Sequence, residues 1–348
     1  MALAAAPVLP TMNPCSRALA EREVTDMRLI YFGANPLAYP AIRQWSQRND
    51  VEVTCVREGL NADNIGMVQG YDGICLYLSD AMRSDESIYR TLHEYGIRQL
   101  SITATGVDGL NRQYAQQYGF HVTNVPGYSP TSVGHFALMS VLMGLRCIAA
   151  VEKDALDSRT MIGRELSDVT VGVLGTGRIG SVVADGVTAL GGHVIACSAR
   201  TNPLLEGRVR YVDFERLLEQ SDVISIHVPL TEETYHKFDF GAFSRMKQGS
   251  CLVNTARGAI VDTEALLAAL DAGRVGGAVL DCVEDEERYM ATGWKKNPLV
   301  QRLTRYPNVM VTPHVAYYTQ RAVDEIAVAA LDNAKNVIET GRSVDMVL

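Results

Sequence analysis

A glycine-rich loop with the spacing G-x-G-x-x-G directly follows a strand-like run at 169–174 and opens a helical stretch. Backbone amides and the N-terminus of that helix can both face an anion at this loop. Glycine suits the loop because a side chain would block the close approach of a pyrophosphate. The order strand, loop, helix and strand therefore predicts a dinucleotide site. The predicted contacts in the loop are Gly175, Gly177, Arg178, Ile179 and Gly180.

The residue that closes the next strand decides which dinucleotide fits, because an acidic side chain there binds the ribose 2′-hydroxyl and repels a 2′-phosphate. In this chain Ser198 holds that position, and Arg200 follows two residues later. A hydroxyl and a guanidinium suit a 2′-phosphate better, so we expect NADP(H) to be favoured and NAD(H) to be possible. The alternative is that Arg200 is a solvated surface charge.

Strand-like and helical segments alternate along the chain, which is typical of parallel sheets covered by helices. The predicted strands are 27–32, 51–56, 72–78 and 99–103, followed by a second series at 169–174, 193–197, 223–228, 251–255, 278–281 and 309–313. We therefore predict an α/β protein with two doubly wound parallel-sheet domains. One is a Rossmann cofactor domain, and the other is a flavodoxin-like substrate domain.

A long apolar helix at 131–156 is expected to separate the two series, and an amphipathic helix at 319–340 returns to the first domain. A further helix is expected between Asp262, as its N-cap, and Gly273, as its stop. Because the helix at 131–156 is apolar on much of its surface, we also expect it to form a homodimer interface. The predicted divisions are a flexible extension at 1–26, a substrate domain at 27–128 and 317–348, and a cofactor domain at 129–316.

Composition excludes several classes of protein. The chain has 348 residues, too many for one ordinary core, and its net charge is −8 with no basic cluster, so a nucleic-acid partner is not expected. No apolar run is long enough to suggest a membrane partner. The seven cysteines form no CxxC pair, which favours reduced thiols in a cytoplasmic protein.

Three segments in the second half of the chain resemble the D-2-hydroxyacid dehydrogenases, especially the D-lactate dehydrogenase branch. They are Asn254-Thr-Ala-Arg-Gly258, Asp281-Cys-Val-Glu-Asp-Glu286 and Thr312-Pro-His-Val-Ala-Tyr-Tyr318. The patterns SDxTVGVxGTGxIG and HxAYYT also resemble the D-lactate dehydrogenases of vancomycin resistance. The similarity runs from about Met27 to the C-terminus.

The resemblance implies three catalytic residues. Arg257 would bind the carboxylate and carbonyl of a small 2-oxo acid, and its planar fork matches a carboxylate in two hydrogen bonds. His314 would donate the proton to the carbonyl oxygen during hydride transfer, and Glu286 would hold His314 in its protonated form. Glu284 lies in the same acidic stretch, but the family places its glutamate five residues after the aspartate, which selects Glu286.

Further contacts follow from the same resemblance. Asp281 would position the nicotinamide carboxamide, and backbone amides near Thr105 would bind the substrate carboxylate. The other implied cofactor contacts are Val228, Pro229, Thr234, Thr255 and Ala256. The implied substrate contacts are Tyr77, Thr105, Gly106, Tyr128 and Tyr317, in a cleft between the domains. For any one of the tyrosines, the alternative is a packing role.

Two features bear on these expectations. Thr103-Ala104 stands where lactobacillus-type enzymes often have an arginine, which weakens the case for pyruvate as substrate. Most of the remaining histidines have no ligand spacing, so we expect surface or packing roles and no metal. These histidines are His93, His121, His135, His193 and His236, whereas His227 is expected near the cofactor.

Two other functions share this fold. Phosphoglycerate, glyoxylate, phosphite and formate dehydrogenases resemble the chain in layout, although the formate type pairs its histidine with glutamine. Dinucleotide-sensing corepressors have the same fold and are binding proteins. The Arg257, Glu286 and His314 set favours an enzyme, and turnover of any 2-oxo acid would discriminate.

Overall fold

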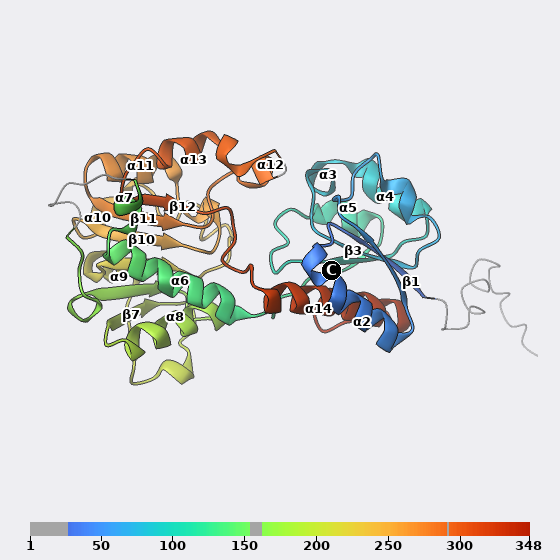
Figure 1. Cartoon of the computed structure of the whole chain (residues 1–348), viewed down its shortest axis with the longest axis horizontal. Coiled ribbons are helices and arrows are strands. Elements are labelled where there is room, and N and C mark those ends of the chain that lie inside the picture. The colour runs from blue at the N-terminus through green and yellow to red at the C-terminus, as the bar shows by residue number, and fades with distance from the viewer. Residues whose placement is uncertain (1–26, 154–161, 291) are drawn as a thin grey trace, which may run out of the picture. The chain divides into compact units, whose positions relative to one another are not determined.

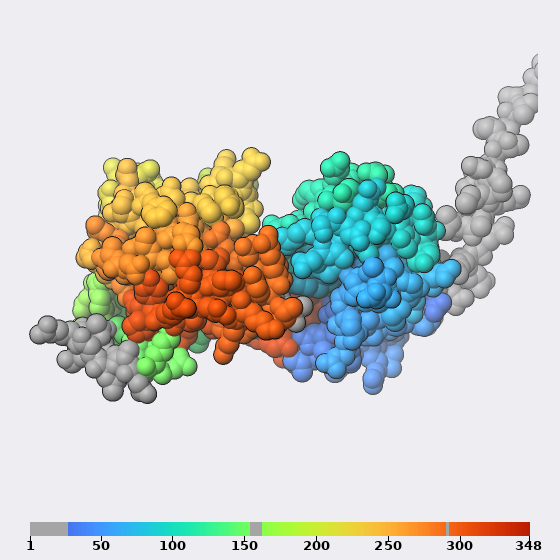
Figure 2. All heavy atoms as spheres, turned by 90° about the horizontal axis from the view of Figure 1, so that it is seen from above, coloured from blue at the N-terminus to red at the C-terminus, as the bar shows by residue number. Residues whose placement is uncertain are grey.

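The computed structural model describes residues 27–153, 162–290 and 292–348, which divide into two compact units. Unit 1 contains the chain up to Pro126 together with Val323–Leu348, and unit 2 contains Gly127–Ala322. In Figure 2, unit 1 is the blue and cyan part of the chain, and unit 2 contains the yellow and orange part. The predicted extension at 1–26 lies outside the described residues.

Unit 1 is built on a five-stranded parallel sheet in the order β2-β1-β3-β4-β5. Its inner strands are buried on both faces, which explains why they are nearly continuous apolar runs. The order is that of a flavodoxin-like sheet, as predicted. The strands are β1 (Arg28–Phe32), β2 (Glu52–Val56), β3 (Gly73–Leu76), β4 (Gln99–Ile102) and β5 (His121–Thr123), and the α-helices before the crossover are α2 (Tyr39–Asn49), α3 (Asp80–Ser84), α4 (Glu86–Glu94) and α5 (Arg112–Gln117).

The last helix, α14 (Gln320–Thr340), completes unit 1 and lies beside α2 in Figure 1. Trp45 of α2 donates a hydrogen bond from Nε1 to Asp332 Oδ1 of α14 at 2.6 Å. Ser101 of β4 donates from Oγ to the Ala330 carbonyl at 2.8 Å. The C-terminal residues then form an antiparallel bridge between Met346 and Thr123 of β5.

Unit 2 is built on a seven-stranded parallel sheet in the order β12-β11-β10-β9-β6-β7-β8. The strand order reverses between β6 and β9, where doubly wound folds bind ligands at the carboxyl ends of the strands. The strands are β6 (Thr170–Leu174), β7 (His193–Cys197), β8 (Arg210–Tyr211), β9 (Val223–Ile226), β10 (Ser250–Asn254), β11 (Val275–Leu280) and β12 (Val309–Val311). The α-helices are α6 (Pro130–Leu145), α7 (Ile148–Glu152), α8 (Arg178–Ala189), α9 (Phe214–Gln220), α10 (Phe240–Arg245), α11 (Thr263–Asp271), α12 (Glu287–Met290) and α13 (Pro298–Leu303).

Local signals position α11 as predicted. Asp262 Oδ1 accepts hydrogen bonds from the amides of Glu264 and Ala265, so the N-cap satisfies two donors at the start of the helix. Gly273 follows the helix with a φ of 63°, a conformation that favours glycine. In the described part of the chain, no helix is both long enough and apolar enough to span a membrane.

The prediction of one helix over 131–156 is wrong. The helix α6 ends at Leu145, and α7 begins at Ile148 after Cys147, whose φ of 54° is left-handed and therefore cannot continue an α-helix. Residues 154–156 of the predicted helix lie outside the described residues.

Candidate active site

His314 lies on a turn directly after β12, and the carboxylate of Asp281 holds that turn in place. Asp281 Oδ1 accepts hydrogen bonds from Thr312 Oγ1 at 2.5 Å and from the Val315 amide at 2.9 Å, while Oδ2 accepts from the Ala316 amide at 2.7 Å. The φ of His314 is 54°, which is uncommon for a residue with a side chain. Because Asp281 is 1% exposed and binds residues on both sides of His314, it fixes this conformation.

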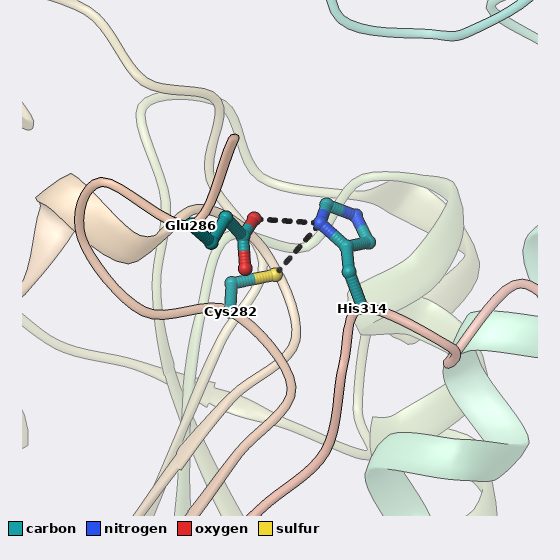
Figure 3. A group of neighbouring side chains, drawn as sticks. All are labelled: Cys282, Glu286 and His314. Atoms are coloured by element: carbon teal, nitrogen blue, oxygen red, sulfur yellow. Dashed lines mark hydrogen bonds and ion pairs between the residues drawn. The ribbon is translucent and has the colours of Figure 1, made fainter. Parts of the chain in front are cut away.

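Glu286 lies against the imidazole of His314. The Nδ1 atom of His314 and Oε1 of Glu286 are 2.7 Å apart, and Sγ of Cys282 lies 3.7 Å from the same nitrogen. Figure 3 shows both side chains pointing from the turn after β11 towards Nδ1. If Nδ1 carries a hydrogen and donates it to Glu286, Nε2 is the nitrogen left for a substrate.

The surroundings of His314 favour its charged form. Burial works against the charge, but the contacts with Cys282 and Glu286 outweigh it and raise the pKa of His314 well above its ordinary value. Burial also raises the pKa of the Cys282 thiol, to about 11, so this side chain is a neutral thiol near pH 7. The carboxylate of Glu286 is therefore the charge that stabilises the imidazolium.

The same three residues have a spacing that a metal ion could use, since their ligand atoms all lie within 4.8 Å of one another. Two ligands of a tetrahedral zinc ion, however, would stand roughly 3.4 Å apart. The 2.7 Å between Nδ1 and Oε1 is the length of a direct, charge-assisted hydrogen bond. We therefore interpret the group as a proton donor and its partner.

Arg257 follows β10 and begins a tight turn that packs on the segment carrying Glu286. Its carbonyl accepts a hydrogen bond from Asn254 Nδ2 at 2.8 Å, and its own Nη1 donates to the Ala256 carbonyl at 2.8 Å. A Cβ atom at Gly258 would lie 2.2 Å from the carbonyl carbon of Val283, so only glycine allows this contact.

Glu284 does not contact His314. Its Oε1 lies 2.6 Å from Nε2 of His236, a histidine that we expected to have only a surface or packing role. The separation of the two glutamates is thus clear from the geometry: Glu286 contacts His314, and Glu284 contacts His236.

The predicted substrate contacts fall in both units. Tyr128 and Tyr317 belong to unit 2, where their rings are 6.0 Å apart and the Tyr317 ring is 6.4 Å from that of His314. Tyr77, Thr105 and Gly106 belong to unit 1. Thr105 is held at the end of its strand region by a 2.6 Å hydrogen bond that its carbonyl accepts from Asn124 Nδ2.

The glycine-rich loop between β6 and α8 has the shape that a pyrophosphate needs. A Cβ atom at Gly175 would lie 2.6 Å from the His227 carbonyl oxygen, and one at Gly180 would lie 1.9 Å from that of Gly175. These two glycines therefore allow close backbone packing. Gly177 has open space at its Cβ position and is the N-cap of α8, with Arg178 exposed and Ile179 half-buried beside it. The loop fits a bound dinucleotide.

Ser198 and Arg200 stand where predicted, after β7. The Thr176 amide of the loop donates a hydrogen bond to Ser198 Oγ at 3.3 Å, and Arg200 is exposed. The remaining predicted cofactor contacts follow β9, β10 and β11 at the same carboxyl edge of the sheet. They are Val228 and Pro229 with Thr234, whose Oγ1 donates to the Pro229 carbonyl, then Thr255 and Ala256, and finally Asp281.

Two functional features could not be read from the sequence. One is the set of hydrogen bonds by which Asp281 holds the turn of His314, because the partners are backbone amides and carry no side-chain signal. The other is the contact between Glu284 and His236, which are 48 positions apart.

His227 was expected near the cofactor, and its backbone lies against Gly175 of the glycine-rich loop. Burial lowers the pKa of His227 to about 3, so this histidine is neutral.

Comparison with known proteins agrees with this geometry. A family model described as "D-isomer specific 2-hydroxyacid dehydrogenase, NAD binding domain" matches residues 138–316. A D-lactate/D-glycerate dehydrogenase of Pediococcus acidilactici is 36% identical over 330 residues, which cover 92% of this chain and 99% of that protein.

Solved structures match over a similar span. A D-lactate dehydrogenase from Treponema pallidum has a TM-score of 0.83 and 31% identity, and the match covers 92% of this chain and 100% of that one. A D-lactate dehydrogenase from Lactobacillus jensenii, solved with NAD+, has a TM-score of 0.79 and 29% identity over 92% of this chain and 100% of its own.

Proposed function

The chain belongs to the D-isomer specific 2-hydroxyacid dehydrogenase family, and we propose that it reduces a small 2-oxo acid, pyruvate or a close homologue, to the (R)-2-hydroxy acid. The observation that carries the proposal is the 2.7 Å contact between His314 Nδ1 and Glu286 Oε1. A histidine held in its charged form by a half-buried carboxylate is suited to donate a proton to a carbonyl oxygen.

Each catalytic residue has one task in this reaction. Arg257 binds the substrate carboxylate and orients the carbonyl, because its guanidinium can form two parallel hydrogen bonds. His314 donates the proton from Nε2 to the carbonyl oxygen, and Glu286 stabilises the imidazolium before the transfer. Tyr317 lies beside the His314 ring, and Tyr128 packs against Tyr317.

A bound reduced nicotinamide would supply the hydride that reaches the carbonyl carbon. The glycine loop would hold its pyrophosphate, and the residues after β7 would face the adenosine ribose. We propose NAD(H) as the cofactor. The predicted preference for NADP(H) has no support from the comparisons, since the family model is of an NAD-binding domain and the Lactobacillus jensenii structure was solved with NAD+.

Several finer assignments stay predictions. These are the roles of Tyr77, Thr105 and Gly106 at the substrate, the contact of Asp281 with the nicotinamide, the homodimer and the cytoplasmic location. The relative from Pediococcus acidilactici is named for both D-lactate and D-glycerate, so a small hydroxyl-bearing acid is also a candidate substrate.

A panel of 2-oxo acids tests the proposal. Pyruvate, hydroxypyruvate, glyoxylate and longer homologues would be assayed with NADH and with NADPH, and the configuration of each product would be determined by chiral chromatography. We expect turnover of at least one small 2-oxo acid to the (R)-product. An absence of turnover across the panel, with NADH binding retained, would favour a dinucleotide-sensing binding protein instead.

A further inference from the structure

Glu284 is a half-buried carboxylate that the reaction does not use, yet both of its oxygens are bound. Oε1 lies 2.6 Å from His236 Nε2, and Oε2 accepts hydrogen bonds from the amide of Thr263 at 2.9 Å and from its hydroxyl at 2.6 Å. The side chain of Glu284 is 18% exposed, so water contributes little to its solvation. A carboxylate in this position is retained at a desolvation cost, which the three contacts offset.

These contacts join three segments of unit 2. Thr263 is the first residue of α11, so its amide has no partner within the helix and can donate to Glu284. This amide stands at the positive end of the helix and stabilises the negative charge of the carboxylate. His236 comes from the loop before α10, and its own amide donates to the Ala259 carbonyl at 2.9 Å. Glu284 itself belongs to the turn after β11.

His236 has an uncommon backbone conformation. Its φ is 46°, which is left-handed, and its ring stacks on that of Tyr235 with centroids 4.1 Å apart. A second carboxylate, Asp262, has its Oδ2 3.8 Å from His236 Nδ1. The imidazole is thus placed between two acidic side chains and aimed at Glu284.

The segment 257–263 is consequently attached to the turn 282–286 at both of its ends. At the near end, Gly258 packs on the backbone of Val283 and Glu284 with no room for a side chain. At the far end, Thr263 binds the carboxylate of Glu284. Arg257 begins the first segment and Glu286 ends the second, so the attachment sets the distance between them.

We propose that Glu284, His236 and Thr263, here called the Glu284 network, position Arg257 relative to Glu286 and His314. This inference rests on the proposed function, because it assumes that those three residues carry out the reduction. The members of the network are positioning residues and do not contact the substrate. Small displacements of a bound substrate from its donor lower the rate steeply, so the network acts on substrate binding and turnover together.

Three variants separate positioning from general folding. Glu284→Ala removes all three contacts, and His236→Ala removes one of them while leaving Thr263 bound. Glu284→Gln keeps an acceptor for Thr263 and can donate to a neutral His236, so it should recover much of the loss. Glu287→Ala is the matched control, since Glu287 is an exposed acidic residue in the same stretch.

Three quantities would be measured for each variant: kcat/KM for the best 2-oxo acid of the panel, the inhibition constant of oxamate, an unreactive 2-oxo acid analogue, and the dissociation constant of NADH by fluorescence. We expect Glu284→Ala and His236→Ala to lower kcat/KM about 10- to 100-fold and to raise the inhibition constant of oxamate by a similar factor. NADH binding, and every quantity in the control, should stay within about twofold of wild type. A variant that combines Glu284→Ala with His236→Ala should have a kcat/KM no lower than that of Glu284→Ala alone, because Glu284→Ala already removes all three contacts.

The inference is overturned if both single variants keep kcat/KM near wild type, or if NADH binding falls as much as kcat/KM, which would indicate a general loosening of unit 2. If Glu284→Ala does not fold, His236→Ala carries the test of the loss, and Glu284→Gln should keep most of the wild-type kcat/KM. The variant His314→Gln, measured in the same way, distinguishes a failure of the network from a failure of the proposed function. Activity that survives His314→Gln contradicts the catalytic roles given under the proposed function, whereas loss in His314→Gln without loss in these variants contradicts the network alone.

Discussion

Glu284 and Glu286 stand two residues apart on one turn, yet each carboxylate binds a different histidine, His236 and His314 respectively. The turn separates them because Asp285, between the two, has a left-handed φ of 58° and directs the flanking side chains to different neighbours. One short acidic stretch can therefore serve both the proton donor and the segment that carries Arg257.

Replacing His314 with glutamine should remove the proton donor and leave the cofactor loop intact. We expect turnover to fall by ~10²- to 10⁴-fold, the usual contribution of a positioned general acid. NADH titrations should give an unchanged dissociation constant, because the loop between β6 and α8 is separate from the turn of His314. A variant that keeps a third of wild-type turnover would remove His314 from the mechanism.

The pH dependence of reduction should shift in Glu286→Gln. Reduction needs a protonated His314, and the pKa of His314 is raised in the folded protein, so the wild-type rate should persist into alkaline pH. Removing the anion lowers that pKa, and the imidazole then loses its proton at a lower pH. The falling limb of kcat/KM against pH should therefore move to lower pH.

Glu284→Gln is the control for this shift. Because Glu284 contacts His236 and not His314, it should change the height of the pH profile but not the position of its falling limb. A shifted limb in Glu284→Gln, with none in Glu286→Gln, would reverse the assignment of the two glutamates.

Asp281→Asn should disorder the turn that carries His314. Asp281 accepts one hydrogen bond from a hydroxyl and two from amides, and the NH2 group of asparagine would face one of these donors. We expect a loss of about 1 to 3 kcal/mol in the free energy of unfolding, together with a large loss of turnover. Urea unfolding would measure the first, and Asp285→Asn, at an exposed site on the neighbouring turn, is the control.

Cofactor choice should respond to Ser198. A carboxylate at this position would accept hydrogen bonds from the ribose of NADH and repel a 2′-phosphate, so Ser198→Asp should lower kcat/KM for NADPH at least about tenfold, or ~1.4 kcal/mol, while keeping NADH use. Arg200→Ala should weaken any use of NADPH and leave NADH use unchanged. If Arg200→Ala changes neither, the exposed guanidinium is a solvated surface charge.

Much of the fold followed from the sequence because long apolar strands leave a clear pattern. Every strand predicted in the two series is present within a few residues of its expected bounds. The strands that were missed, β5 and β8, have three and two residues, too few for any periodicity to appear. The break at Cys147 was missed because a left-handed residue other than glycine has no sequence signal.

The site was predictable to the extent that it consists of side chains in family motifs. Arg257, Glu286 and His314 occupy recognisable segments, and the structure places Glu286 against His314. What fixes them is mostly backbone: the amides that bind Asp281, the contact of Gly258 with Val283, and the amide of Thr263 on Glu284. Backbone partners depend on the fold, so no residue type indicates them in advance.

The two units should also differ in when they can be completed during synthesis. All strands of unit 2 lie within residues 170–311, so its sheet can close as soon as that stretch has left the ribosome. Unit 1 must wait longer, since Trp45 and Ser101 have their partners on α14 and β5 pairs with Met346. Its first strands therefore emerge early but gain these contacts only at the end of synthesis, which makes unit 1 the later of the two units to be completed.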